Sequence, residues 1–125
     1  MMSCKRSVYQ LNPLTTGFGA SICGIKLCEA LDNEEVQTQI KEDLYKHRLL
    51  IFKDQGKMSA ETQLSVSRWF GTVESTFHRH PRSPHKDIFR VSNDPEEGCT
   101  NVGRSGWHID GTFMTEPFKS KFSSV

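Results

Sequence analysis

The sequence predicts a small α+β domain, and three observations lead to that prediction. Short apolar segments separated by glycine and proline occur near the N-terminus and again in the second half, and these indicate strands. Two longer segments with helical spacing lie between them. The length of 125 residues matches one domain, which we assign to 1–125. The expected strands cover residues 7–11, 19–23, 49–52, 87–93 and 107–113.

The first helix is predicted from an apolar stripe. Val36, Ile40 and Leu44 recur at every fourth position, which places them on one face of a helix. Asp32 is the expected N-cap, because its carboxylate can accept hydrogen bonds from the free N–H groups of the first turn. Cationic residues at 46–48 suit the last turn, where the helix dipole favours positive charge.

The next two elements follow from a continuous apolar run and from a capping residue. Residues 49–52, LLIF, predict a strand that is buried on both faces. Ser59 is the expected N-cap of a second helix that runs to Phe70, with Gly71 as its stop.

Composition excludes several classes of function. The 16 Lys and Arg residues nearly balance the 15 Asp and Glu residues, so no basic surface for nucleic acid is expected. No run approaches the ~20 apolar residues of a membrane span, and the N-terminus lacks the apolar core of a secretory signal. The four cysteines form no C-x-x-C pair, so free thiols and a cytoplasmic location are expected. A homo-oligomer is compatible with these features.

One short segment, GWHIDGTF at 106–113, carries a candidate metal site. On a strand, His108 and Asp110 would point to the same face, about 6.6 Å apart at the backbone, and could converge on one ion. Ile109 and Trp107 would then point to the opposite face and pack there. A third ligand from elsewhere would complete the two-histidine-one-carboxylate arrangement of non-haem Fe(II) oxygenases.

The H-x-D spacing alone leaves other interpretations open. A surface strand with a solvated aspartate and a hydrogen-bonded histidine has the same pattern. A zinc site built from four histidines is a further alternative, although H-x-H-x₄-H matches no structural zinc pattern. The histidines concerned are His78, His80, His85 and His108.

Several segments together resemble the TauD/TfdA-like family of Fe(II)- and 2-oxoglutarate-dependent dioxygenases. GWHIDGTF resembles the W-H-x-D-x-x-F segment of that family, and four more segments match in family order. They are LTTGFGASICGIKL at 14–27, HRLLIFKDQ at 47–55, SVSRWFGTV at 65–73, with a tryptophan inserted before Phe-Gly, and FHRHP at 77–81.

The resemblance implies a double-stranded β-helix, or jelly roll, of which this chain would be a truncated N-terminal part with two helices. It implies that His108 and Asp110 ligate Fe(II), that 2-oxoglutarate and O₂ are co-substrates, and that the substrate is a small anionic molecule. The distal histidine, the threonine and the arginine of the family lie in its second half, and no residue here matches them. We therefore expect the isolated chain to be a fragment, poorly stable and inactive.

The resemblance also suggests substrate contacts. His80 matches the second histidine of H-x-H-P, which contacts the anionic group of the substrate. Arg104 stands where the taurine enzyme carries an asparagine, and Asn101 lies three residues earlier; either could contact an anion. Trp107 and Phe113 are expected to pack around the metal strand.

Two other classes of function remain as alternatives at this stage. One is a catalytically inactive homologue that acts as an interaction partner. The other is a small metal-binding module unrelated to oxidation. Tight stoichiometric iron binding would favour the module, because a two-ligand site binds metal weakly.

Overall fold

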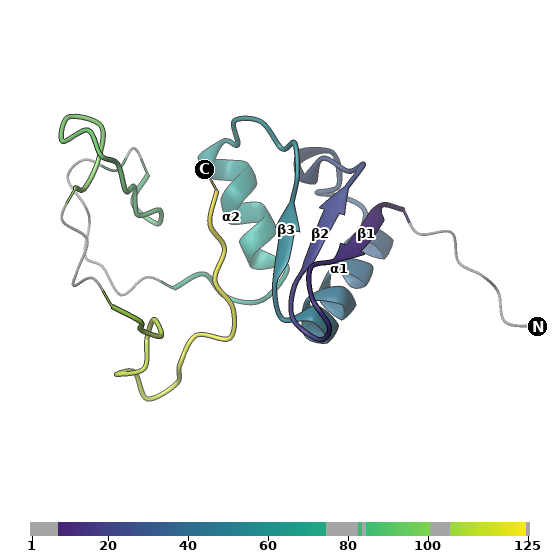
Figure 1. Ribbon diagram of the computed structural model, residues 1–125. Helices are drawn as coiled ribbons and strands as arrows, with labels where there is room; N and C mark the ends of the chain where they lie inside the picture. Colours follow the sequence, from purple (N-terminus) through teal and green to yellow (C-terminus); the bar gives the residue numbers. More distant parts are fainter. Residues whose placement is uncertain (1–7, 75–82, 84, 101–105, 125) are drawn as a thin grey trace, which may run out of the picture.

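The structure is a computed structural model that describes residues 8–74, 83, 85–100 and 106–124. Its centre is a three-stranded mixed sheet of order β1-β2-β3, flanked by two α-helices (Figure 1). Strand β1, Gln10–Pro13, pairs antiparallel with β2, Ala20–Cys23. Strand β3, Leu50–Phe52, pairs parallel with β2. The α+β prediction is confirmed for this unit, whereas the described residues do not form a jelly roll.

Helix α1, Glu34–His47, lies between β2 and β3 in the chain and provides the connection that a parallel pair requires. A short 3-10 helix, η1, Leu27–Glu29, precedes it. The N-cap is Asn33 rather than the predicted Asp32, because the Asn33 side chain accepts a hydrogen bond from the Val36 N–H at 3.1 Å. Aspartate and asparagine are both favoured at an N-cap. Asn33 takes the position because its side chain reaches the free N–H of Val36, three residues later.

Helix α2, Ala60–Arg68, begins as predicted at Ser59, whose hydroxyl accepts from the Thr62 N–H at 3.1 Å. It ends two residues before the predicted Phe70, with Trp69 as its C-cap. Within the part of the chain that the structure describes, no helix combines the length and apolar character needed to cross a lipid bilayer.

The core lies between the sheet and the helices. Ala20 and Ile22 of β2 point into it and are fully buried, and they meet Val36 and Ile40 from the inner face of α1. The prediction that residues 49–52 are buried on both faces is wrong. Ile51 is 37% exposed, so its face of β3 is partly open to solvent.

Gln55 connects the end of β3 to η1. Its side-chain oxygen accepts from the Leu27 N–H at 2.9 Å, and its amide nitrogen donates to the carbonyls of Ile25 at 2.9 Å and Lys53 at 2.7 Å. One side chain therefore satisfies three backbone groups, one at the start of η1 and two outside the helices and strands. This network gives a physical reason for a glutamine at the end of HRLLIFKDQ.

The strands predicted at 87–93 and 107–113 are not formed. In the first segment only an isolated parallel bridge joins Val91 to Cys99. In the second, the backbone turns at 110–113. Alternating side chains predict a strand only where another strand is available to pair with it, and no neighbour pairs with these segments among the described residues.

The last part of the chain returns to the α/β unit, and we call residues 118–124 the C-terminal segment. The Lys119 ammonium lies 5.4 Å from the centre of the Tyr45 ring on α1. Phe122 packs against the core, and the Ser124 hydroxyl donates to the Gln63 side chain on α2 at 2.8 Å. Figure 1 shows this segment in yellow beside α2.

Candidate metal centre

His108 and Asp110 converge in the structure, although not on a strand. The His108 Nε2 atom lies 3.3 Å from the Asp110 Oδ1 atom. The two residues stand at the start of the turn at 110–113, and this turn brings the imidazole and the carboxylate together. The two side chains lie close together, whereas the prediction that a strand places them is wrong; that they share a metal ion stays a prediction.

A backbone carbonyl orients the imidazole. The His108 Nδ1 atom lies 3.0 Å from the Gly106 carbonyl oxygen. A carbonyl only accepts hydrogen bonds, so Nδ1 carries the proton in the neutral ring and Nε2 keeps its lone pair. Nε2 faces Asp110, to which it donates when the ring is protonated and beside which it offers a lone pair when the ring is neutral. Metal-binding histidines commonly donate their second N–H to a carbonyl in this way.

The carboxylate has a second partner, Lys121 from the C-terminal segment. The Lys121 ammonium donates to the Asp110 Oδ2 atom, while Oδ1 faces His108. The hydrogen bond from Lys121 is the main cause that lowers the pKa of Asp110, and the neighbouring His108 lowers it further. Asp110 therefore stays ionised at neutral pH, which is the state that a metal ligand needs.

Gly111 allows the turn that follows Asp110. Its φ angle is 76°, a left-handed conformation that side chains other than glycine rarely adopt. A Cβ atom placed there would lie 2.8 Å from the Phe118 Cδ2 atom. Glycine is therefore required both by the backbone conformation and by the close approach of the Phe118 ring.

The donor pair fits two positions of a ferrous site. An imidazole nitrogen and a carboxylate oxygen are ligands of the non-haem Fe(II) type. Two such atoms, each ~2.1 Å from one ion and roughly at right angles, are ~3.0 Å apart. The observed 3.3 Å is close to that separation. Within the described ranges, no group of three or more His, Cys, Asp or Glu side chains is placed to hold a metal, so the fit extends to two ligands.

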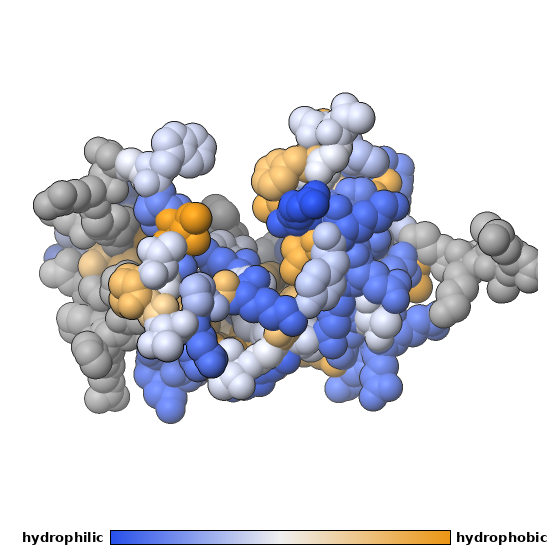
Figure 2. Space-filling model, turned by 90° about the horizontal axis from the view of Figure 1, so that it is seen from below, coloured by the Kyte–Doolittle hydropathy of each residue, from blue (hydrophilic) through white to orange (hydrophobic). Residues whose placement is uncertain are grey.

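The surroundings of this pair are more open than predicted. Trp107 is fully exposed, and Ile109 and Phe113 are 75% and 80% exposed, so the predicted packing of all three side chains is wrong. Figure 2 shows the apolar residues on its visible face in small scattered groups rather than in one continuous surface. The segment that carries these side chains is not a strand of the sheet, so the packing expected on its faces does not arise among the described residues.

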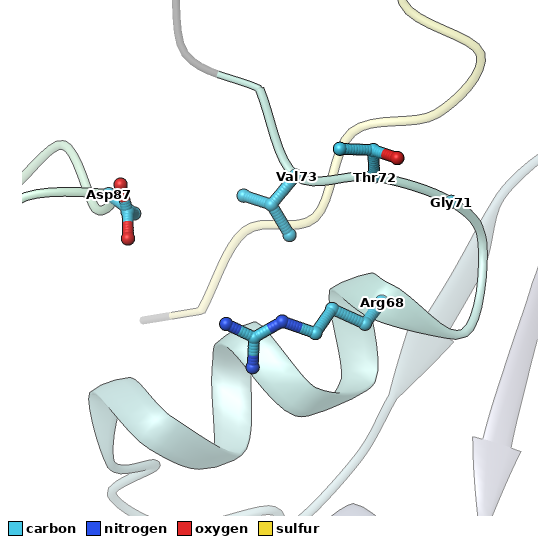
Figure 3. Close-up of a pocket in the computed structure, with 5 residues that line it drawn as sticks. All are labelled: Arg68, Gly71, Thr72, Val73 and Asp87. Atoms are coloured by element: carbon cyan, nitrogen blue, oxygen red, sulfur yellow. The ribbon is translucent and has the colours of Figure 1, made fainter.

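The proposed substrate contacts His80, Arg104 and Asn101 lie outside the described residues, as does His78 of the alternative zinc site. A shallow pocket of about 600 Å³ lies elsewhere, between the end of α2 and the segment near Asp87. In Figure 3, Arg68 extends from α2 below Val73, and Asp87 lies across the gap. Neither His108 nor Asp110 lines this pocket, so we place the candidate chemistry at the donor pair rather than here.

Lys121 and Gly111 are the functional features that sequence reasoning missed. The Asp-Gly pair at 110–111 is a recognised turn signal and favours a turn over a strand at this position. No comparable signal exists for Lys121, because its contact with Asp110 depends on the reversal of the chain between them.

Comparison with known proteins gives an independent line of observation. Residues 10–121 match the family described as taurine catabolism dioxygenase TauD, TfdA family. An (S)-phenoxypropionate/alpha-ketoglutarate-dioxygenase from Sphingobium herbicidovorans is 29% identical over 85% of this chain and 36% of its own length. An alkylsulfatase from Acinetobacter baylyi is 33% identical over 84% of this chain and 31% of its own length. The chain thus spans about a third of the length of these relatives.

Two solved structures are similar to parts of the chain. AAD-2 in complex with Mn(II) and N-oxalylglycine has 23% identity, covers 53% of this chain and 25% of its own, and gives a TM-score of 0.48. A protein from Burkholderia xenovorans described as an alpha-ketoglutarate-dependent taurine dioxygenase has 27% identity, covers 61% and 28%, and gives a TM-score of 0.49.

The family match extends over most of the chain and includes the segment that carries His108 and Asp110. The chain belongs to the TauD/TfdA family of dioxygenases.

Proposed function

We propose that this protein is an Fe(II)- and 2-oxoglutarate-dependent dioxygenase that hydroxylates a small anionic substrate, with His108 and Asp110 as two of its iron ligands. The observation that carries the proposal is the 3.3 Å approach of His108 Nε2 to Asp110 Oδ1, with the Gly106 carbonyl facing the other ring nitrogen.

In this mechanism each residue has a separate task. His108 Nε2 offers a neutral lone pair, and the Gly106 carbonyl keeps the ring in that tautomer. Asp110 offers an ionised oxygen, and Gly111 permits the turn that holds it beside the imidazole. Bound ferrous iron supplies the oxidative chemistry with 2-oxoglutarate and O₂, whereas the protein supplies position and charge.

The rest of the site is also part of the proposal. The relatives are about three times as long as the matched region. The family resemblance implies a distal histidine and a 2-oxoglutarate-binding arginine in its second half. We propose that activity needs such residues in addition to 1–125, and that the described α/β unit packs onto a jelly roll. Succinate formation from 2-oxoglutarate by the purified 125-residue chain would contradict this part of the proposal.

The anionic substrate class is supported by the relatives. Their names refer to a phenoxypropionate, which is a carboxylate, and to alkyl sulfates, which are sulfate esters. We propose His80, Arg104 and Asn101 as the residues that contact the anionic group, because two of them can carry positive charge and the third can donate hydrogen bonds.

A metal titration tests the site itself. Mn(II) replaces Fe(II) as an air-stable probe, and the free ion is measured by electron paramagnetic resonance. We expect His108→Ala and Asp110→Ala each to weaken Mn(II) binding at least about tenfold, since each removes one of two ligands. His85→Ala and Asp32→Ala are matched controls away from the pair. Equal binding by all five proteins, wild type included, would contradict the proposed site.

A further inference from the structure

Lys121 is a cation bound to a carboxylate that we propose as a metal ligand. Its ammonium occupies the Oδ2 side of Asp110, and the His108 imidazole occupies the Oδ1 side. The lysine lies eleven residues after Asp110 and belongs to the C-terminal segment. Both oxygens of the carboxylate are therefore already in contact with a protein group, one of which carries a full positive charge.

We propose that Lys121 is an internal competitor for the metal ion at the His108–Asp110 pair, an inference that rests on the proposed function. The two oxygens of one carboxylate are adjacent, so an ion on Oδ1 and an ammonium on Oδ2 would be only ~4–5 Å apart. That separation is well inside the ~10 Å Debye length at 0.1 M salt, so the repulsion between them persists in ordinary buffers. Metal binding therefore either displaces Lys121 or is weakened by it.

Lys121 could also strengthen metal binding, but this effect is smaller than the repulsion. The ion pair with Lys121 restricts the rotation of the Asp110 side chain and could thereby prepare it for a metal. The Lys121 side chain is 68% exposed, and exposed ion pairs contribute little order or stability. The repulsion involves a divalent ion and a full positive charge, so the charge product is twice that of the ion pair. We expect repulsion to dominate.

The position of Lys121 also connects the metal site to the α/β unit. Lys119 and Ser124, on either side of it, contact Tyr45 of α1 and Gln63 of α2. These contacts keep the C-terminal segment near the unit and the Lys121 ammonium near Asp110. A metal ion that displaces Lys121 would leave the contacts at Tyr45 and Gln63 in place, because neither of them involves the carboxylate.

The test compares Mn(II) binding to the full chain and to three variants. Lys121→Met removes the charge and keeps the length of the side chain; we expect its dissociation constant for Mn(II) to fall about tenfold. Lys121→Arg keeps the charge and should bind as the wild type does. Lys57→Met removes the same charge at an exposed position between β3 and α2, outside the C-terminal segment and the turn at 110–113, and should change the dissociation constant by less than about twofold.

Salt dependence separates competition from a structural effect. If Lys121 repels the metal, the difference between wild type and Lys121→Met should shrink as KCl rises from ~20 mM to ~500 mM. Circular dichroism checks that the variants fold. Binding to Lys121→Met that is unchanged or weaker, or a difference that does not respond to salt, overturns the proposal.

The outcomes also distinguish this proposal from the proposed function. Binding that requires His108 and Asp110 but is insensitive to Lys121→Met overturns the competitor and leaves the two-ligand site. If Lys121→Met tightens Mn(II) binding even when His108 is replaced by alanine, the two-ligand site is overturned. Competition between Lys121 and the metal ion at Asp110 then still stands. Absence of Mn(II) binding in every variant, Lys121→Met included, overturns both.

Discussion

Gln55 offers the sharpest test of how the α/β unit is held together. The substitution Gln55→Ala removes one acceptor and one donor group that together make hydrogen bonds to the N–H of Leu27 and to the carbonyls of Ile25 and Lys53. The Leu27 N–H stands at the start of η1, where a helix offers it no partner, and the two carbonyls lie outside the strands, so no strand or helix partner replaces the lost side chain.

The size of the effect follows from the number of bonds. A hydrogen bond contributes about 0.5–1.5 kcal/mol net, so three bonds set a range of about 1.5–4.5 kcal/mol. Gln55 is half-buried, and water can reach some of the groups it leaves. We therefore expect Gln55→Ala to lower the free energy of unfolding by about 2 kcal/mol. Gln55→Glu keeps an acceptor for Leu27 but loses both donors, and it should be destabilised by at least as much.

Urea unfolding followed by circular dichroism measures this loss. With a slope of about 2 kcal/mol per molar urea, the midpoint should fall by about 1 M. The control is Gln10→Ala, which removes a single exposed hydrogen bond of 3.3 Å to Asn12 and should shift the midpoint very little. A midpoint for Gln55→Ala that matches the Gln10→Ala control would refute the reasoning.

Two further predictions concern a buried tyrosine and the turn at the metal centre. Burial, and then the 2.5 Å hydrogen bond to Asp43, raise the pKa of Tyr9, so the folded protein keeps a proton that the unfolded chain releases above pH ~10. The free energy of unfolding should therefore fall as pH rises above ~10, and alkaline urea titrations should show that Tyr9→Phe lacks this part of the fall; an identical slope in both proteins would count against it. Gly111→Ala should weaken Mn(II) binding several-fold without loss of circular dichroism signal, because it strains a φ of 76° and places Cβ 2.8 Å from Phe118. Gly56→Ala, which strains a similar φ of 67° outside the metal centre and meets no atom within 4 Å, is its control, and equal affinities in the two variants would exclude a role for the turn.

The sequence predicts the first half of this fold well, because local signals and tertiary contacts agree there. The spacing of Val36 and Ile40 predicts a helix face, and both side chains are buried in the core. Ser59 caps α2 as its residue type suggests. The shift of the first cap from Asp32 to Asn33 shows the limit of such signals, since the two residue types are almost equivalent and only the backbone geometry separates them.

The second half is harder to predict, because its structure depends on partners rather than on local preference. Alternation at 87–93 and 107–113 predicts strands, but a strand needs a neighbour with free backbone groups. Convergence of His108 and Asp110 was predicted from a spacing of two, and a turn produces the same convergence. The contact of Lys121 with Asp110 requires a chain reversal over eleven residues, and no periodic pattern encodes that.

The anchoring of the C-terminal segment on Tyr45 and Gln63 has a consequence for the mobility of the metal centre. The turn at 110–113 is continuous in the chain with this anchored segment. Anchoring removes conformations that a free end would sample, which reduces the entropy lost when an ion is bound. Substitutions on the two helices can thus alter affinity for an ion that neither helix touches.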